Sequence, residues 1–255
     1  MGVMRRPALL PAFLCALACT ACAASPRTPS LVIAVDVGHS RAHPGATSAR
    51  GVPEFQFNAT LAGEVAEALR QDGMAVDLIG ADGGVNGLAE RTAAARTARA
   101  GFFLSIHHDS VKDEYLQPWQ WQGTEHRYAD ASFSGFGLFV SRKNPHLLES
   151  LHCASAIGQR LQAEGFHHST YHADRVMGEG REWADEQNGV YYYDNLVVLK
   201  TARQPAVLLE AGVIVNRDEE TALASPQAQD RMVHAVRAGL EACGAVGVAQ
   251  ASAAR

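Results

Sequence analysis

Four side chains of this 255-residue chain have metal-binding or acid–base chemistry: His39, His107 and Glu210 follow apolar runs, and Glu54 opens the helix predicted after the first of these runs. His107 follows the largely apolar run 101–106, and Glu210 follows the run 206–209. An imidazole or a carboxylate in apolar surroundings is costly unless a metal ion, a hydrogen-bond network or a shifted pKa accommodates it. His107 and Glu210 therefore require partners. Groups whose pKa values are shifted in this way gather at functional sites.

Two imidazoles and two carboxylates are the composition of a catalytic zinc site. Such a site uses three protein ligands, leaves one position open for water and keeps a further carboxylate as general base. Taken alone, His39 is also explained as an ordinary loop histidine, and Glu54 as an acid favoured by the dipole of a helix N-terminus. The prediction of chemistry rests on the four residues together.

Strands and helices that alternate along the chain are predicted to position these side chains. Hydrophobic patterning predicts strands over 31–37, 74–79, 101–107, 135–141, 196–200 and 206–215, and helices over 53–71, 88–99, 145–163 and 226–243. This alternation predicts an α/β fold: a single domain with a twisted, mostly parallel sheet of about six strands and helices on both faces. Ligands bind at the carboxyl ends of the strands in such a sheet, so we expect the four side chains to meet at one rim.

The same residues lie in motifs that resemble the zinc-dependent N-acetylmuramoyl-L-alanine amidases, which act on peptidoglycan. The motifs are Val-Asp-Val-Gly-His-Ser at 35–40, the downstream Glu54, Ser-Ile-His at 105–107 and Leu-Leu-Glu-Ala-Gly-Val-Ile-Val-Asn at 208–216. The resemblance implies that His39, Glu54 and His107 bind Zn²⁺ and that Glu210 is the catalytic general base. It also implies hydrolysis of the amide between the lactyl group of N-acetylmuramic acid and L-alanine, with the catalytic domain over 31–243.

Other positions refine this resemblance. Arg91 matches an arginine of the family that we interpret as structural. Ser40 and His43 stand where family members usually have Gly and Asp, and His108-Asp109 replaces the common Ala-Asn. Successive side chains of a strand point to opposite faces, so we expect His108 to lie behind the ligands or on the surface and not to bind the metal.

Two polar segments, near 111–134 and 165–194, interrupt the alternation and are predicted to be insertions. In the first, Trp119, Trp121 and Tyr128 form either a platform for sugar or peptide, or a small core. In the second, the spacing of Glu179, Glu182 and Glu186 predicts a helix over 175–187, either a solvated helix or one that covers the metal. His167, His168 and His172 indicate a second metal site or a flexible loop.

The chain ends and the cysteines bear on the compartment. Residues 1–23 have the pattern of a signal peptide, followed by a linker over 24–30, and 244–255 is predicted to be a disordered tail. The leader ends either by cleavage after small residues or by lipid attachment at Cys22. We therefore expect export to the periplasm or cell envelope. Cys153 and Cys243 are either a disulfide, which that compartment permits, or two buried thiols.

Composition excludes several classes of protein. A chain that is 47% hydrophobic and 19% charged with a net charge of −5 is typical of a globular domain, and it has no basic stripe for nucleic acid. No membrane span is expected beyond the leader. Two alternatives to the amidase remain at this point: another zinc peptidase of the cell wall, or a non-catalytic wall-binding protein with a degenerate site. The chain could find its substrate through its own cleft or through a protein activator.

Overall fold

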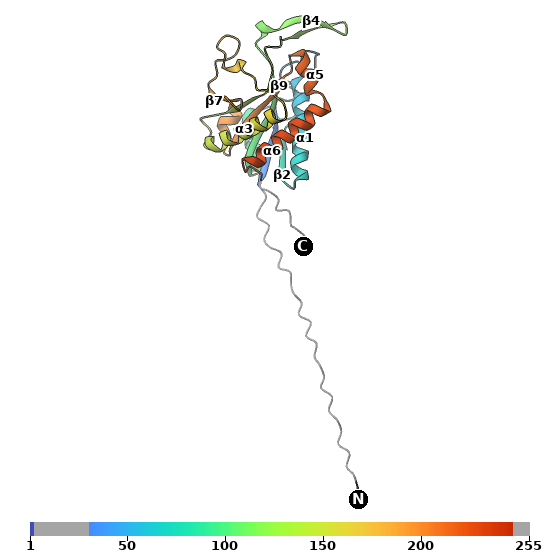
Figure 1. The fold of residues 1–255 in the computed structure, drawn as a ribbon, viewed down its shortest axis with the longest axis vertical. Coiled ribbons are helices and arrows are strands. Elements are labelled where there is room, and N and C mark those ends of the chain that lie inside the picture. The colour runs from blue at the N-terminus through green and yellow to red at the C-terminus, as the bar shows by residue number, and fades with distance from the viewer. Residues whose placement is uncertain (3–30, 247–255) are drawn as a thin grey trace.

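A seven-stranded sheet forms the centre of the protein in the computed structural model, which describes residues 1–2 and 31–246 (Figure 1). Its strands are β1 (Val32–Val37), β2 (Ala75–Ile79), β3 (Ala100–Asp109), β6 (Gly137–Val140), β7 (Trp183–Asp185), β8 (Val190–Tyr192) and β9 (Ala206–Val213). The spatial order is β2-β1-β3-β9-β6-β8-β7. The first four strands in this order are parallel to one another, and β6 pairs with β9 in the antiparallel direction.

Helices cover both faces of this sheet, as predicted. They are α1 (Glu54–Gln71), α2 (Leu88–Thr97), α3 (Leu147–Ala163), α4 (Val197–Thr201), α5 (Arg217–Leu223) and α6 (Pro226–Ala242), with 3₁₀ turns at Asp113–Tyr115 and Tyr171–Ala173. The helices α1, α3 and α6 share a core with one face, while α4 packs on the other face beside α2. The single α/β domain is confirmed, with seven strands where about six were expected. The predicted leader, linker and most of the predicted tail lie outside the described residues.

Strict alternation along the central strands separates the two cores. Val35, Ile106 and Leu209 face the core that contains α1, α3 and α6, whereas Ala34 and Leu208 face the core that contains α4. Side chains two residues apart on a strand share a face. The α2/α4 face therefore also receives the polar side chains Asp36, Ser105, His107 and Glu210.

The prediction of a strand over 196–200 is wrong, because these residues form most of the short helix α4. An apolar run of this length fits a strand or a buried helix equally well, and its surroundings decide between them. Here the Asn144 side chain donates to the carbonyl oxygen of Leu199 at 2.9 Å, and Thr201 Oγ1 lies 3.0 Å from Thr92 Oγ1 of α2. These contacts hold the segment as a helix that packs against α2.

The first insertion is an antiparallel hairpin, β4 (Gln117–Trp121) and β5 (Thr124–Tyr128), which projects from one end of the molecule (Figure 1). The rings of Trp119 and Trp121 stack with centroids 5.5 Å apart. The guanidinium of Arg50 lies 4.8 Å from the Trp121 ring centroid, and Trp119 Nε1 donates to the carbonyl oxygen of Ala49 at 2.8 Å. These contacts fasten the hairpin to the loop that precedes α1.

The second insertion contains no helix over 175–187, so that prediction is wrong. Gly178 packs so closely against Tyr171 that an added Cβ would lie 1.8 Å from the Tyr171 carbonyl oxygen. The segment then continues as the edge strand β7, which pairs with β8. Regular spacing of glutamates did not outweigh this close backbone contact and the strand pairing.

A disulfide joins Cys153 of α3 to Cys243, which caps the C-terminal end of α6, with their Cα atoms 5.0 Å apart. Leu31 and Ala245 line one surface pocket with this disulfide, so the two ends of the described body lie side by side. Within residues 1–2 and 31–246, no helix combines the length and apolarity needed to cross a bilayer.

Candidate active site

The side chains of His39, Glu54 and His107 meet at the carboxyl-terminal rim of the sheet. His39 follows β1, Glu54 is the first residue of α1 and His107 lies near the end of β3. Glu54 Oε2 lies 2.9 Å from His39 Nε2, and Glu54 Oε1 lies 3.1 Å from His107 Nδ1. One ligand atom from each residue falls within 4.8 Å of the other two. The predicted metal-binding residues are thus brought together.

Two nitrogens and one carboxylate fit the donor set of a catalytic zinc site, which has three protein ligands and an open fourth position. Glu54 is buried, and its oxygens also accept from the backbone N–H of Ala46 at 3.1 Å and from Asn58 Nδ2 at 3.0 Å. Burial raises the pKa of Glu54, but the hydrogen bonds to His107 and His39 outweigh this effect and hold the pKa below its ordinary value. The carboxylate is therefore ionised and oriented, as a metal ligand must be.

Two glycines leave the space that the ligands occupy. An added Cβ at Gly38 would lie 2.4 Å from His107 Nε2. Gly45 has a φ of +80°, and a Cβ there would lie 2.4 Å from Glu54 Oε2. The loop after β1 can therefore wrap closely around His39, His107 and Glu54 only because both positions lack a side chain.

A buried ion pair beneath the rim holds the loop after β1 in place. Arg91 of α2 donates to Asp36 Oδ1 at 2.7 Å and to the carbonyl oxygens of Val37 and His39, and Ser105 donates to Asp36 Oδ2 at 2.7 Å. His39 has a φ of +66°, which is uncommon for a residue other than glycine. Arg91 touches the backbone around the ligand and not the ligand's ring, which agrees with the structural role expected for it.

His108 lies behind the ligand cluster, on the opposite face of β3 from His107. It is buried, and its Nδ1 lies 2.8 Å from Asn58 Oδ1, while Asn58 Nδ2 donates to Glu54. Burial lowers the pKa of His108 to about 4, so the ring is neutral. His108 thus orients the residue that orients Glu54. Asn58 was not identified from the sequence, and its position one helical turn after Glu54 is the signal that could have found it.

Glu210 of β9 lies beside His107 in the register of the sheet. Its Oε2 atom is buried and has no hydrogen-bond partner among the described residues. Burial raises the pKa of Glu210 well above its ordinary value, and the nearby carboxylates of Asp109 and Glu54 raise it further. A carboxylate with a raised pKa and a free oxygen next to a metal site has the properties of a general base.

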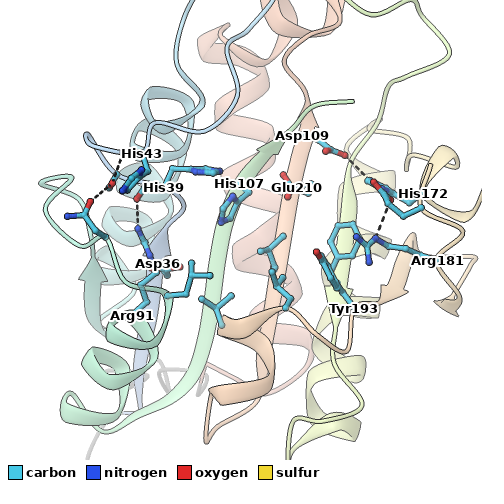
Figure 2. Close-up of a pocket in the computed structure, with 18 residues that line it drawn as sticks. Asp36, His39, His43, Arg91, His107, Asp109, His172, Arg181, Tyr193 and Glu210 are labelled. Carbon is cyan, nitrogen blue, oxygen red and sulfur yellow. Dashed lines mark hydrogen bonds and ion pairs between the residues drawn. The ribbon is translucent and has the colours of Figure 1, made fainter. Parts of the chain in front are cut away.

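These residues open into a cleft of about 440 Å³ on the α2/α4 face (Figure 2). The lining includes His39, His107 and Glu210 on one side and His172, Glu179, Arg181 and Tyr193 on the other. Of the second group, sequence reasoning considered His172 and Glu179 for other roles and missed Arg181 and Tyr193. The side chains of His167, His168 and His172 do not converge: His167 Nε2 lies 3.0 Å from Ser134, whereas His172 lies beside Asp109. Among the described residues, the cluster of His39, Glu54 and His107 is the one group arranged for a metal ion.

Solved structures with the same fold are amidases from several bacteria. The catalytic domain of CwlV from Bacillus (Paenibacillus) polymyxa var. colistinus is 23% identical, with 85% of this chain and 99% of that chain covered and a TM-score of 0.61. Ami1 from Mycobacterium smegmatis is 20% identical, with 84% and 96% covered and a TM-score of 0.65. CwlD from Clostridioides difficile, in complex with the GerS lipoprotein, is 19% identical, with 84% and 98% covered and a TM-score of 0.58. No curated protein matches the chain.

The sequence itself matches a family over nearly the whole described body. Residues 33–242 match the family described as N-acetylmuramoyl-L-alanine amidase. This range includes both predicted insertions and all four residues of the rim. The chain therefore belongs to the N-acetylmuramoyl-L-alanine amidase family and hydrolyses the amide bond between N-acetylmuramic acid and L-alanine in peptidoglycan.

Proposed function

We propose that this amidase depends on Zn²⁺ held by His39, Glu54 and His107, and that Glu210 is its general base. The observation that carries the proposal is the cluster of two imidazoles and an oriented carboxylate beside a buried carboxylate oxygen that no described residue satisfies. Zn²⁺ supplies Lewis-acid chemistry, because it polarises a carbonyl oxygen and lowers the pKa of water.

The chain's own residues would move the proton. Glu210 Oε2 accepts the proton of the attacking water and then donates it to the nitrogen of the departing alanine, which cannot leave as an anion. The raised pKa of Glu210 suits the first half of this transfer, because it makes the carboxylate a stronger base than an ordinary glutamate.

Zinc content and cleavage of purified peptidoglycan test these roles. We expect Glu210→Ala to retain about one zinc per chain and lose cleavage, and His107→Ala to lose both. His152→Ala, at an exposed histidine of α3, is the matched control and should change neither. Free lactyl-muramic ends on the glycan would identify the amidase reaction. Cleavage retained by His107→Ala would reject the proposed zinc site, and zinc binding without cleavage by the unmodified protein would indicate a missing activator.

We also propose that the protein is exported to the periplasm or cell envelope, soluble or anchored through Cys22. The disulfide between Cys153 and Cys243 supports an oxidising compartment. Cell fractionation would test export. The mass of the mature N-terminus, measured in the unmodified protein and in Cys22→Ala, would test attachment through Cys22. A cytosolic protein with an intact N-terminus would reject export.

A protein activator is the further partner that we propose. The support is the neighbouring fold of CwlD, which forms a complex with the GerS lipoprotein. Cleavage by the purified zinc-loaded amidase, measured with and without an envelope extract, tests this proposal. Full activity of the amidase alone, unchanged by the extract, would reject it.

A further inference from the structure

Four side chains of alternating charge form a series along the wall of the cleft that faces the candidate metal site. Asp109 Oδ2 lies 2.7 Å from His172 Nε2, and His172 Nδ1 lies 2.9 Å from Glu179 Oε2. Glu179 Oε2 in turn lies 3.3 Å from Arg181 Nε. Negative and positive groups thus alternate through the series, which ends on the guanidinium of Arg181.

Packing presents this guanidinium to the cleft. Its carbon lies 3.5 Å from the centroid of the Tyr193 ring and 5.7 Å from that of Phe139, and the side chain is 18% exposed. The backbone N–H of Arg181 donates to the carbonyl oxygen of His172 at 2.7 Å, which fixes the start of the side chain. Among the described residues, no acceptor forms a hydrogen bond with its two terminal nitrogens, and Arg181 lines the cleft.

The position of Arg181 relative to Glu210 follows from the sheet. Glu210 lies on β9, Phe139 on the adjacent β6 and Tyr193 just after β8, which is next in order. Strands are about 4.8 Å apart, so the backbones of β9 and β8 lie roughly 10 Å apart, and Glu210 and Arg181 both line the cleft at this part of the sheet. An extended peptide advances about 3.3 Å per residue, so this span corresponds to about two or three residues.

We propose that Arg181, stacked on Tyr193, binds a carboxylate of the stem peptide within two or three residues of the scissile bond. This inference rests on the proposed function for its substrate. A planar guanidinium stacked on an aromatic ring and offering two free nitrogens matches a carboxylate in a two-pronged contact. The series of alternating charges ends on the cationic Arg181, so the next group to bind there should be an anion. Arg181 is thus a specificity-determining residue, separate from the groups that carry out hydrolysis.

Binding by a protein that cannot turn over the ligand tests this proposal. The probe is N-acetylmuramoyl-L-alanyl-γ-D-glutamyl-L-lysine, together with two forms in which one or the other free carboxylate is converted to an amide. Calorimetry would measure their dissociation constants for zinc-loaded Glu210→Gln. We expect one of the two amides to bind roughly tenfold to a hundredfold more weakly than the parent peptide, as charge-assisted hydrogen bonds imply.

The arginine variant must remove that difference. In Glu210→Gln with Arg181→Gln, the parent peptide and both amides should bind equally and weakly, and Arg181→Lys should recover part of the preference. Arg142→Gln is the matched control, because Arg142 stacks on Tyr192 at 4.4 Å and pairs with Glu182 at 2.8 Å but does not line the cleft. It should keep the full preference.

The proposal is overturned if neither amide binds more weakly than the parent peptide, if the preference survives Arg181→Gln, or if none of the peptides binds. A loss of binding that is equal for all three peptides would assign Arg181 a purely structural role and also reject the proposal. Failure of the unmodified protein to cleave the muramoyl–alanine bond would instead reject the proposed function, and the binding ratios would remain measurable.

Discussion

His172 is an imidazole buried between two carboxylates, and its charge depends on them. Burial opposes the charged form, but the carboxylates of Asp109 and Glu179 outweigh it and raise the pKa of His172 to about 9. The neighbouring phenols of Tyr171 and Tyr191 have pKa values raised above 10 by burial and stay neutral near that pH. His172 is therefore an imidazolium in the folded protein at neutral pH.

This raised pKa predicts how stability changes with pH. Because the folded pKa exceeds the ordinary value of 6.5, the stabilisation is fully present below pH 6.5 and is lost as the pH rises through about 9. The contribution should fall by about 1.4 kcal/mol per pH unit in that window, roughly 3 kcal/mol in all. Urea unfolding at several pH values, compared between the unmodified protein and His172→Gln, checks this. Equal slopes for the two proteins between pH 6.5 and 9 would contradict it.

Arg91 is the second buried charge on which the site depends. Arg91→Met leaves Asp36 buried without its ion pair and removes the donors to the carbonyl oxygens of Val37 and His39. We expect a loss of about 3–5 kcal/mol in the free energy of unfolding, as for one member of a buried pair, and weaker zinc binding. Denaturant titration and chelator competition measure the two effects. Arg96→Met, at an exposed position in the last turn of α2, should change neither by a comparable amount.

At the scale of elements, the rim and its four residues could be predicted because β1, β3 and β9 are buried on both faces. Near-continuous apolar runs fix such strands, and their carboxyl ends fix the rim. Two segments could not be assigned from their own sequences. Asn144 holds residues 196–200 as a helix, whereas the close packing of Gly178 and the pairing with β8 decide the conformation of 175–187. Arg181 was missed for the same reason, since its partners come from distant segments.

The loop between β1 and α1 provides a prediction about backbone space. Gly38→Ala places a Cβ within 2.4 Å of the His107 ring, so the ring or the loop must move. We expect zinc affinity to fall by at least tenfold, since metal sites tolerate little displacement of a ligand. Gly63→Ala in α1, where an added Cβ meets no atom within 4 Å, should keep zinc affinity and stabilise the helix by about 0.5–1 kcal/mol. Unchanged affinity in Gly38→Ala would show that the loop has another conformation.

The rim and the disulfide lie at opposite ends of the sheet. The rim with the candidate metal site is at the carboxyl ends of β1, β3 and β9, whereas the disulfide and Leu31 lie beside the start of β1 and β3. The disulfide closes a segment of 90 residues that includes β8 and β9. It therefore constrains the half of the sheet that carries Glu210 and Arg181 without touching the cleft.

Stability and activity should consequently respond differently to reduction. We expect the Cys153→Ala and Cys243→Ala double variant to lose about 2–5 kcal/mol of unfolding free energy, the usual range for a native disulfide. Cleavage of peptidoglycan at 25 °C should keep its kcat within about twofold, because the bond lies far from the rim. Thermal unfolding with and without reductant, followed by activity measurements below the transition, separates the two effects. A variant with normal stability or with greatly reduced kcat would contradict this view.

The adjacency of Leu31 and Ala245 also determines how the enzyme can be held. A tether attached at either end of the described body would emerge beside the start of β1 and β3, so the cleft at the other end of these strands would point away from the point of attachment. Immobilisation through an N-terminal or a C-terminal tag should then give the same orientation and the same access to a large polymer. Both points of attachment thus lie at one end of the molecule, and the cleft lies at the other.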